Sequence, residues 1–217
     1  MVSILKKAIM AVTGLGWFVY VVLHLAGNLL LFKGPETYNA YSEFLVSNPL
    51  IIPAELGLLV FLVAHLASAW RVTRENSAAR PQPYLERVLS RRGGTTSASG
   101  WFSTFASRTM WYGGVLLLFF LILHVWMFKY GDRSGAHGLW GLVVRSFKNP
   151  WISAIYIAAM LPLGFHLSHG FASALQTLGL LKPRWYPGVR RLSQVVGWVL
   201  AAGFILLPLW ALLFAEV

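Results

Sequence analysis

Long apolar runs alternate with short polar stretches along this chain of 217 residues. A helix needs about 20 apolar residues to cross the roughly 30 Å of hydrocarbon in a bilayer. Five runs reach that length, at about 9–32, 50–70, 109–129, 151–174 and 193–214. The pattern therefore predicts an all-α integral membrane protein, a single membrane domain (residues 1–217) with five transmembrane helices, the first four forming a bundle.

The polar stretches between the runs differ in length. Gly34-Pro35, Asn48-Pro49 and Asn149-Pro150 are breaks that predict short connections on one side of the membrane. On the other side, a loop at about 71–108 is rich in Gly, Ser and Thr, which is typical of a linker or of a basic platform for a soluble partner. The first apolar run is too long for a signal peptide, so we expect it to be retained as the first span.

Composition agrees with a membrane protein, because 57% of the residues are hydrophobic, 12% are charged and the mean hydropathy is +0.64. The chain has no cysteine, which excludes a disulfide, a thiolate-held iron–sulfur cluster and a thiolate haem ligand within it. Any metal must therefore be held by histidine, carboxylate or methionine side chains.

The positive charge follows the membrane topology. The net charge is +11, and thirteen of the 18 Lys and Arg residues lie in the N-terminal segment, the long loop and the connection between the fourth and fifth spans. Basic residues favour the cytoplasmic side, so the N-terminus is predicted to be cytoplasmic and the C-terminus outside. Because topology accounts for the charge, we expect no nucleic-acid partner.

Histidines occur inside four of the five predicted spans. His24, His65 and His124 lie in the first three spans, and His166 and His169 lie in the fourth. An ionisable side chain in a membrane usually faces the bundle interior and has a partner. A structural hydrogen bond between helices is the simpler alternative for any one of them.

Depth separates these histidines into two layers. At 1.5 Å rise per residue, His24 and His124 lie about 12 Å and 8 Å from the outer ends of their spans, while His65 and His166 both lie about 22 Å down. Each layer could clamp one haem iron between two imidazoles. His169 lies about 27 Å down, so His166 is the better match to His65, by a margin of one helical turn.

Small and basic residues accompany the histidines. Glycines recur in all four spans, which favours close helix packing and leaves room for a porphyrin. Arg108 lies at the inner end of the third span, where it could pair with haem propionates or extend to the membrane surface. His169 is a further candidate on the propionate side of a haem.

Four segments carry a family resemblance, "LHLAGNLLLF" with His24, "VAHLASAWR" with His65, "SRTMWYGGVLLLFFLILHVWMF" with His124 and "GFHLSHGF" with His166. With these segments in this order, the chain resembles the single-chain, five-helix dihaem cytochrome b anchor of succinate:menaquinone oxidoreductases and quinol:fumarate reductases. The resemblance implies two b haems, one held by His24 with His124 and one by His65 with His166.

The same resemblance implies partners and a location. They are an iron–sulfur subunit and a flavoprotein subunit on the cytoplasmic side, menaquinone in the membrane, and the bacterial cytoplasmic membrane as the location; a higher oligomer of the whole complex is an option. The chain itself has no flavin or dicarboxylate motif, so it would carry electrons and would not oxidise succinate.

The quinone site is expected near the outer haem, where a proton donor or acceptor is needed. Glu55, at the mouth of the second span, and Glu43, in the outer loop, are the candidates, each of which could instead be a solvated carboxylate. One family pattern places a carboxylate two residues before the fourth-span ligand, and this chain has Gly164 there.

Three other functions stay open at this point. The chain could be the cytochrome b of a different membrane oxidoreductase, of hydrogenase or formate dehydrogenase type. It could be a membrane metalloenzyme with clustered histidines around a non-haem metal. It could also be a transporter that uses its intramembrane histidines and Glu55 as a proton relay.

Overall fold

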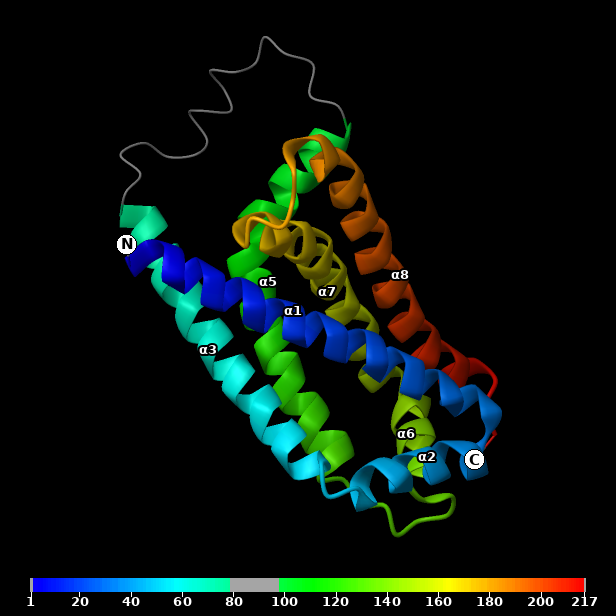
Figure 1. Cartoon of the computed structure of the whole chain (residues 1–217). Coiled ribbons are helices and arrows are strands. Elements are labelled where there is room, and N and C mark those ends of the chain that lie inside the picture. Colours follow the sequence, from blue (N-terminus) through cyan, green and yellow to red (C-terminus); the bar gives the residue numbers. More distant parts are fainter. Residues whose placement is uncertain (1, 79–97, 217) are drawn as a thin grey trace.

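Five long helices dominate the structure, a computed structural model that describes residues 2–78 and 98–216 (Figure 1). They are α1 (Val2–Asn28), α3 (Ile51–Ala78), α5 (Ala98–Lys129), α7 (Pro150–Thr177) and α8 (Tyr186–Leu213). All five contain a segment long and apolar enough to cross a membrane, and the described residues include no strand. The predicted all-α, five-helix membrane protein is confirmed, while the orientation of its termini stays a prediction.

The predicted loop at about 71–108 is partly helical. α3 continues to Ala78 and α5 already begins at Ala98, so both helices extend beyond their apolar runs. A helix can do this because its backbone hydrogen bonds are internal and need no apolar side chains outside the membrane. Residues 79–97 of this loop lie outside the described residues.

The helices pack as a chain of neighbours. α7 and α8 form the most extensive helix pair, α1 packs against both α3 and α7, and α5 packs against α7 (Figure 1). At the α7–α8 contact, the hydroxyl of Ser193 donates to the carbonyl of Ser168 over 2.8 Å. By contrast, the described parts of α3 and α5 make few close backbone contacts with each other, and side-chain contacts such as that of Trp70 with Trp111 connect them.

Two short amphipathic helices close one end of the bundle, where the prolines had predicted short connections. They are α2 (Pro35–Ser47), which follows the 3-10 turn η1 (Leu29–Lys33), and α6 (Gly138–Lys148). One face of α6 is buried, and the indole nitrogen of Trp140 donates to the carbonyl of Leu31 over 2.9 Å. We call this the capped end; it is the predicted outer end.

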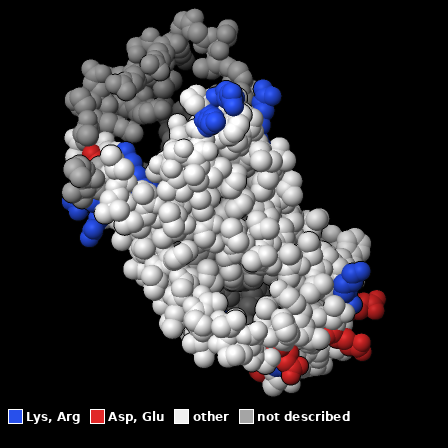
Figure 2. Space-filling view, in the orientation of Figure 1, with Lys and Arg blue, Asp and Glu red and all other residues white. Residues whose placement is uncertain are grey.

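The opposite end of the bundle, which we call the basic end, holds the N-terminus and the turn η2 (Pro183–Trp185) between α7 and α8. Figure 2 shows Lys and Arg gathered there, an uncharged band across the middle of the molecule, and Asp and Glu, together with further Lys and Arg, at the capped end. Lys6 pairs with Glu75 at the basic end, and Lys129 pairs with Glu55 at the capped end. The band between these ion pairs has the character of a membrane-embedded surface.

Candidate functional site

Four imidazole rings meet in two pairs inside the uncharged band. His24 of α1 and His124 of α5 have ring centroids 5.6 Å apart, and we call them the capped-end pair. His65 of α3 and His166 of α7 have ring centroids 6.2 Å apart, and we call them the basic-end pair. The structure therefore brings together one histidine from each of four helices, two by two.

The two pairs lie at different levels in the bundle. Counting residues along α1, α5 and α7 gives the same separation between the two levels. On α1, His24 is ten residues from Gly14, which lies against His65. On α5, His124 is ten residues from Gly114, the glycine nearest to His166. On α7, His166 is ten residues from Tyr156, which lies against His124. Ten residues of helix correspond to about 15 Å along the axis.

Aromatic rings enclose the capped-end pair. The ring of Tyr20 stacks on that of His24 with centroids 5.3 Å apart, and Phe204 of α8 lies 5.9 Å away on centroids. Around His124, the rings of Phe120, Phe128 and Tyr156 lie at centroid distances of 5.8, 5.5 and 6.0 Å. Such an apolar wall shields the two imidazoles from lipid and water. Helix α8, which has no histidine, contributes to this wall through Phe204.

A polar side chain lies against His24 within this wall. The amide nitrogen of Asn28, one turn further on α1, donates to the backbone carbonyl of His24 over 2.8 Å and lies 3.4 Å from both ring nitrogens. The hydroxyl of Tyr38 in α2 donates to the Asn28 carbonyl oxygen over 3.2 Å. Burial raises the pKa of Tyr38 to about 12, against a smaller lowering by Arg133, so this hydroxyl keeps its proton at neutral pH.

Two groups on α1 contact the ring of His65 and orient it. The Nδ1 atom of His65 lies 3.2 Å from the carbonyl oxygen of Met10 and 3.3 Å from the hydroxyl of Thr13. Thr13 donates its own proton to the carbonyl of Ile9 over 2.7 Å, so its oxygen can accept from His65. These contacts favour a proton on Nδ1 and leave Nε2 as a lone-pair donor.

Gly14 on α1 allows the close approach of His65. A Cβ atom at Gly14 would lie 3.2 Å from Cε1 of the His65 ring, a tight contact that would press on the imidazole. At Gly114 a Cβ atom would lie 3.9 Å from Cε1 of His166, which is ordinary contact. The ring of His65 is therefore held more closely than that of His166.

Two imidazoles have unused bonding capacity. The Nδ1 atoms of His124 and His166 are buried and have no hydrogen-bond partner among the described residues. Leaving such an atom unsatisfied in an apolar interior costs about 1–3 kcal/mol. A metal between two imidazoles, with metal–nitrogen bonds of about 2.1 Å, places the ring centroids about 6.5 Å apart, slightly more than the observed 6.2 Å and somewhat more than the observed 5.6 Å. The donor set therefore fits a bis-imidazole metal group at each pair.

Two other predicted residues stand apart from the pairs. His169, one turn beyond His166 on α7, is half-buried and within electrostatic reach of Arg190 of α8. The side chain of Arg108 lies outside the described residues, so its predicted contact with propionates stays a prediction.

Gly164 is small for a packing reason. A Cβ atom there would lie 2.9 Å from the indole ring of Trp198 on α8. A carboxylate at this position would need Trp198 to move, so glycine here is coupled to the way in which α8 packs on α7.

The two carboxylates considered for quinone chemistry have different surroundings. Glu55, in the first turns of α3, forms an ion pair with Lys129 at the end of α5, and about half of each side chain is exposed. Glu55 and Tyr41 are also within electrostatic reach of Tyr20, the residue that stacks on His24. Glu43 is exposed on α2. Glu55 is therefore near enough to the capped-end pair to act electrostatically on Tyr20, the ring that stacks on His24.

Larger clusters of metal-binding side chains are absent from the described part of the chain: no three His, Asp or Glu side chains come close enough to share one metal ion. Four of the five intramembrane histidines occur in two pairs, and His169 lies apart from them. This arrangement lacks the dense histidine cluster that a non-haem membrane metalloenzyme would need.

Sequence reasoning missed the residues that hold the imidazoles in place, above all Thr13 and Asn28. Both are polar residues inside an apolar run, and Asn28 follows His24 by four residues, the spacing that places two side chains on one helix face. That spacing is a signal that could have found Asn28. No local pattern connects Thr13 with His65, because they lie on different helices.

Taken together, five apolar helices and two intramembrane imidazole pairs define a polytopic membrane protein with two bis-histidine sites. The chain is similar to the succinate dehydrogenase cytochrome b558 subunit of Bacillus subtilis (strain 168), with 23% identity over 163 residues, which are 75% of this chain and 73% of that protein. This similarity confirms the resemblance to a succinate dehydrogenase cytochrome b anchor, at modest identity. No protein-family model and no solved structure matches the chain.

Proposed function

We propose that the chain is the membrane-anchoring cytochrome b subunit of a succinate dehydrogenase, in which two b haems carry electrons between an iron–sulfur subunit and menaquinone. The observation that carries this proposal is the arrangement of four histidines from four helices as two facing pairs. The name of the similar Bacillus protein supports the same class. Haem b is a one-electron carrier when it is bound between two imidazoles.

The chain's own residues would have distinct roles at each haem. His24 and His124 would hold one iron, within an aromatic wall that excludes water. His65 and His166 would hold the other, with the His65 ring oriented by α1. The two haems would lie at levels about 15 Å apart, so electrons could pass from one to the other along the bundle axis.

The basic end is the surface that we assign to the soluble partners. It carries the described cations of the N-terminal segment and of the α7–α8 connection, and Glu75 is the described acidic residue among them. Such a surface suits an iron–sulfur subunit with an acidic face, and a flavoprotein subunit would join through it. From the similarity to the Bacillus subtilis protein, we infer that the chain lies in a bacterial cytoplasmic membrane.

The test of this function is a pyridine haemochrome assay with a reduced-minus-oxidised spectrum on the purified protein. Two haems b per chain are expected, together with co-purification of a flavoprotein and an iron–sulfur protein. A correctly folded chain without haem would exclude the proposal, and co-purification with hydrogenase or formate dehydrogenase subunits would move it to those complexes.

For the quinone site we propose the capped end, with Glu55 as the proton-transferring carboxylate. Its support is the ion pair with Lys129, which holds the carboxylate at the mouth between α3 and α5, and its reach to Tyr20 beside His24. Glu43, which is exposed on α2, is the second candidate.

Glu55→Gln is expected to lower the turnover of quinone reduction by about 100-fold, because a positioned proton donor or acceptor contributes about that factor or more. The measurement is succinate-driven reduction of a menaquinone analogue by the purified complex, with haem content as the folding control. Glu36→Gln, which removes another carboxylate at the capped end, is the matched control and should retain activity. Equal activity in Glu55→Gln and Glu36→Gln would assign the role away from Glu55, and Glu43→Gln would then be tested.

Thr13→Val is expected to raise the midpoint potential of one haem and leave the other unchanged. The hydroxyl accepts from Nδ1 of His65, and a hydrogen bond of this kind makes an imidazole a stronger donor to a metal, which favours the oxidised iron. Losing about 1 kcal/mol corresponds to a shift of up to about 40 mV for one electron. Redox titration measures the shift, and Ser146→Ala, which removes a hydroxyl bonded within α6, should cause none.

A further inference from the structure

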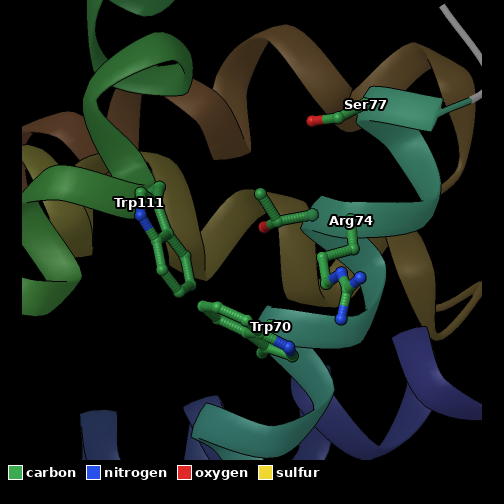
Figure 3. Close-up of a pocket in the computed structure, with 5 residues that line it drawn as sticks. Trp70, Arg74, Ser77 and Trp111 are labelled. Carbon is green, nitrogen blue, oxygen red and sulfur yellow. The ribbon is translucent and has the colours of Figure 1, made fainter.

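A pocket of about 330 Å³ lies between α3 and α5 near the basic end, outside both histidine pairs. Its lining residues are Trp70, Thr73, Arg74, Ser77 and Trp111. Figure 3 shows Trp111 reaching from α5 toward Trp70 on α3, with Arg74 and Ser77 further along α3. The two indole rings have centroids 5.3 Å apart and connect the two helices at a point where their backbones do not pack.

The pocket combines one cation with hydroxyl groups and indoles. The guanidinium of Arg74 lies 5.9 Å from the centroid of the Trp70 ring, and no carboxylate among the described residues pairs with it. Thr73 and Ser77 contribute hydroxyl groups to the same lining. A guanidinium that no described carboxylate neutralises, beside hydroxyl donors, is suited to a phosphate group, which accepts several charge-assisted hydrogen bonds.

The position of Arg74 on its helix separates the pocket from the haem sites. Each residue of an α-helix is rotated by about 100° from the one before, so Arg74, nine residues after His65, lies about 180° around α3. Trp70 lies about 140° around by the same count. His65 faces the bundle interior, whereas Trp70 and Arg74 lie on the side of α3 turned away from it, so we do not assign the anion of this pocket to a propionate of a haem held by His65.

Apolar side chains continue from the pocket toward the middle of the membrane. On α3, Val63, Val60 and Leu56 precede Trp70 on the same exposed side, with exposed fractions between 58% and 63%. On α5, Leu116 and Phe119 follow Trp111 and are 60% and 66% exposed. The surface is thus polar and cationic at the pocket and apolar over the next turns, as an amphiphile with an anionic head and hydrocarbon tails requires.

We propose that this pocket binds the phosphate headgroup of an anionic membrane phospholipid, whose acyl chains lie along the apolar surfaces of α3 and α5. Arg74 holds the phosphate, Thr73 and Ser77 donate hydrogen bonds to it, and the two indoles pack against the glycerol region. A pocket of this volume suits a headgroup, while the tails stay in the bilayer. The proposal is independent of haem binding and of succinate oxidation.

The test uses the purified full chain in its native complex, delipidated in detergent and then mixed with dioleoyl phosphatidylglycerol or dioleoyl phosphatidylcholine. Native mass spectrometry counts the retained lipids. The wild-type protein is expected to retain one more phosphatidylglycerol than phosphatidylcholine. Arg74→Gln should weaken that retention by about fivefold to tenfold, given about 1 kcal/mol or more for one cation near a phosphate.

Arg71→Gln is the matched control, since Arg71 is an exposed cation of α3 outside the pocket. It should retain phosphatidylglycerol as the wild-type protein does, and both variants should keep the wild-type haem spectrum as evidence of folding. Equal retention in both variants, or no preference over phosphatidylcholine, would overturn the proposal. Loss of a soluble subunit from Arg74→Gln with unchanged lipid retention would also overturn it, because the pocket would then be a protein contact.

Discussion

His166→Ala is expected to yield a complex with one haem b per chain instead of two. The imidazole of His166 faces that of His65 at 6.2 Å between centroids, and the capped-end pair consists of two other histidines on two other helices. Removing one of two axial ligands leaves the iron with a single protein bond, whereas His24 and His124 would keep theirs. The measurement is the ratio of haem to polypeptide from the pyridine haemochrome assay.

His169→Ala is the control for this result, because it removes an imidazole one turn away on the same helix and should leave both haems in place. Low-spin signals in electron paramagnetic resonance would show in addition which haem is lost, since the two sites have different surroundings. Loss of a haem in His169→Ala and not in His166→Ala would contradict the assignment of the basic-end pair. Loss of both haems in His166→Ala would mean that the two sites assemble together.

Gly197→Leu is expected to lower the stability of the membrane domain by about 3 kcal/mol or more. A Cβ atom at Gly197 would lie 2.7 Å from the backbone nitrogen of Ser168 and 3.1 Å from the carbonyl oxygen of Gly164. Backbone atoms cannot rotate away as side-chain ends do, so α8 would have to move off α7, and overpacking of this kind typically costs 1–3 kcal/mol or more. Thermal unfolding of the detergent-solubilised protein, followed by the haem absorbance, measures the loss.

Gly188→Leu makes the same chemical change on the same helix and is the matched control. A Cβ atom at Gly188 would meet nothing within 4 Å, and the residue is exposed. Its unfolding temperature should therefore stay near that of the wild-type protein or rise slightly, because glycine is a poor helix former. Equal destabilisation by both substitutions would show that the α7–α8 contact is not the cause.

The long helices were predictable because apolar runs of membrane length have few alternatives in a lipid environment. The two short helices of the capped end were not predicted, although α6 carries a local signal. Trp140, Val143, Val144 and Phe147 follow the spacing of one buried helix face. Proline and glycine breaks on either side suggested short connections, and a helix of 11 residues is marginal until a partner surface covers its apolar face.

For the histidines too, part of the site was predictable from the sequence and part was not. Their depth in the membrane follows from position in the chain, because a helix has a fixed rise per residue. Depth also predicted which histidines share a level, but how closely two rings approach depends on helix rotation and on neighbours, and the ring distances of 5.6 and 6.2 Å come from the folded bundle. Whether each pair binds haem stays a prediction that the spectra described above will test.

The sequence by itself determined that this is a five-span helical membrane protein, which of its helices carry intramembrane histidines and at which depth. The tertiary structure decided what surrounds those histidines: Thr13 and the carbonyl of Met10 on His65, Asn28 and Tyr38 near His24, and Trp198 at Gly164. The physical reason is that hydropathy and helical rise are properties of one segment. Contacts between helices depend on their relative rotation and distance, which the packing of all the segments sets together.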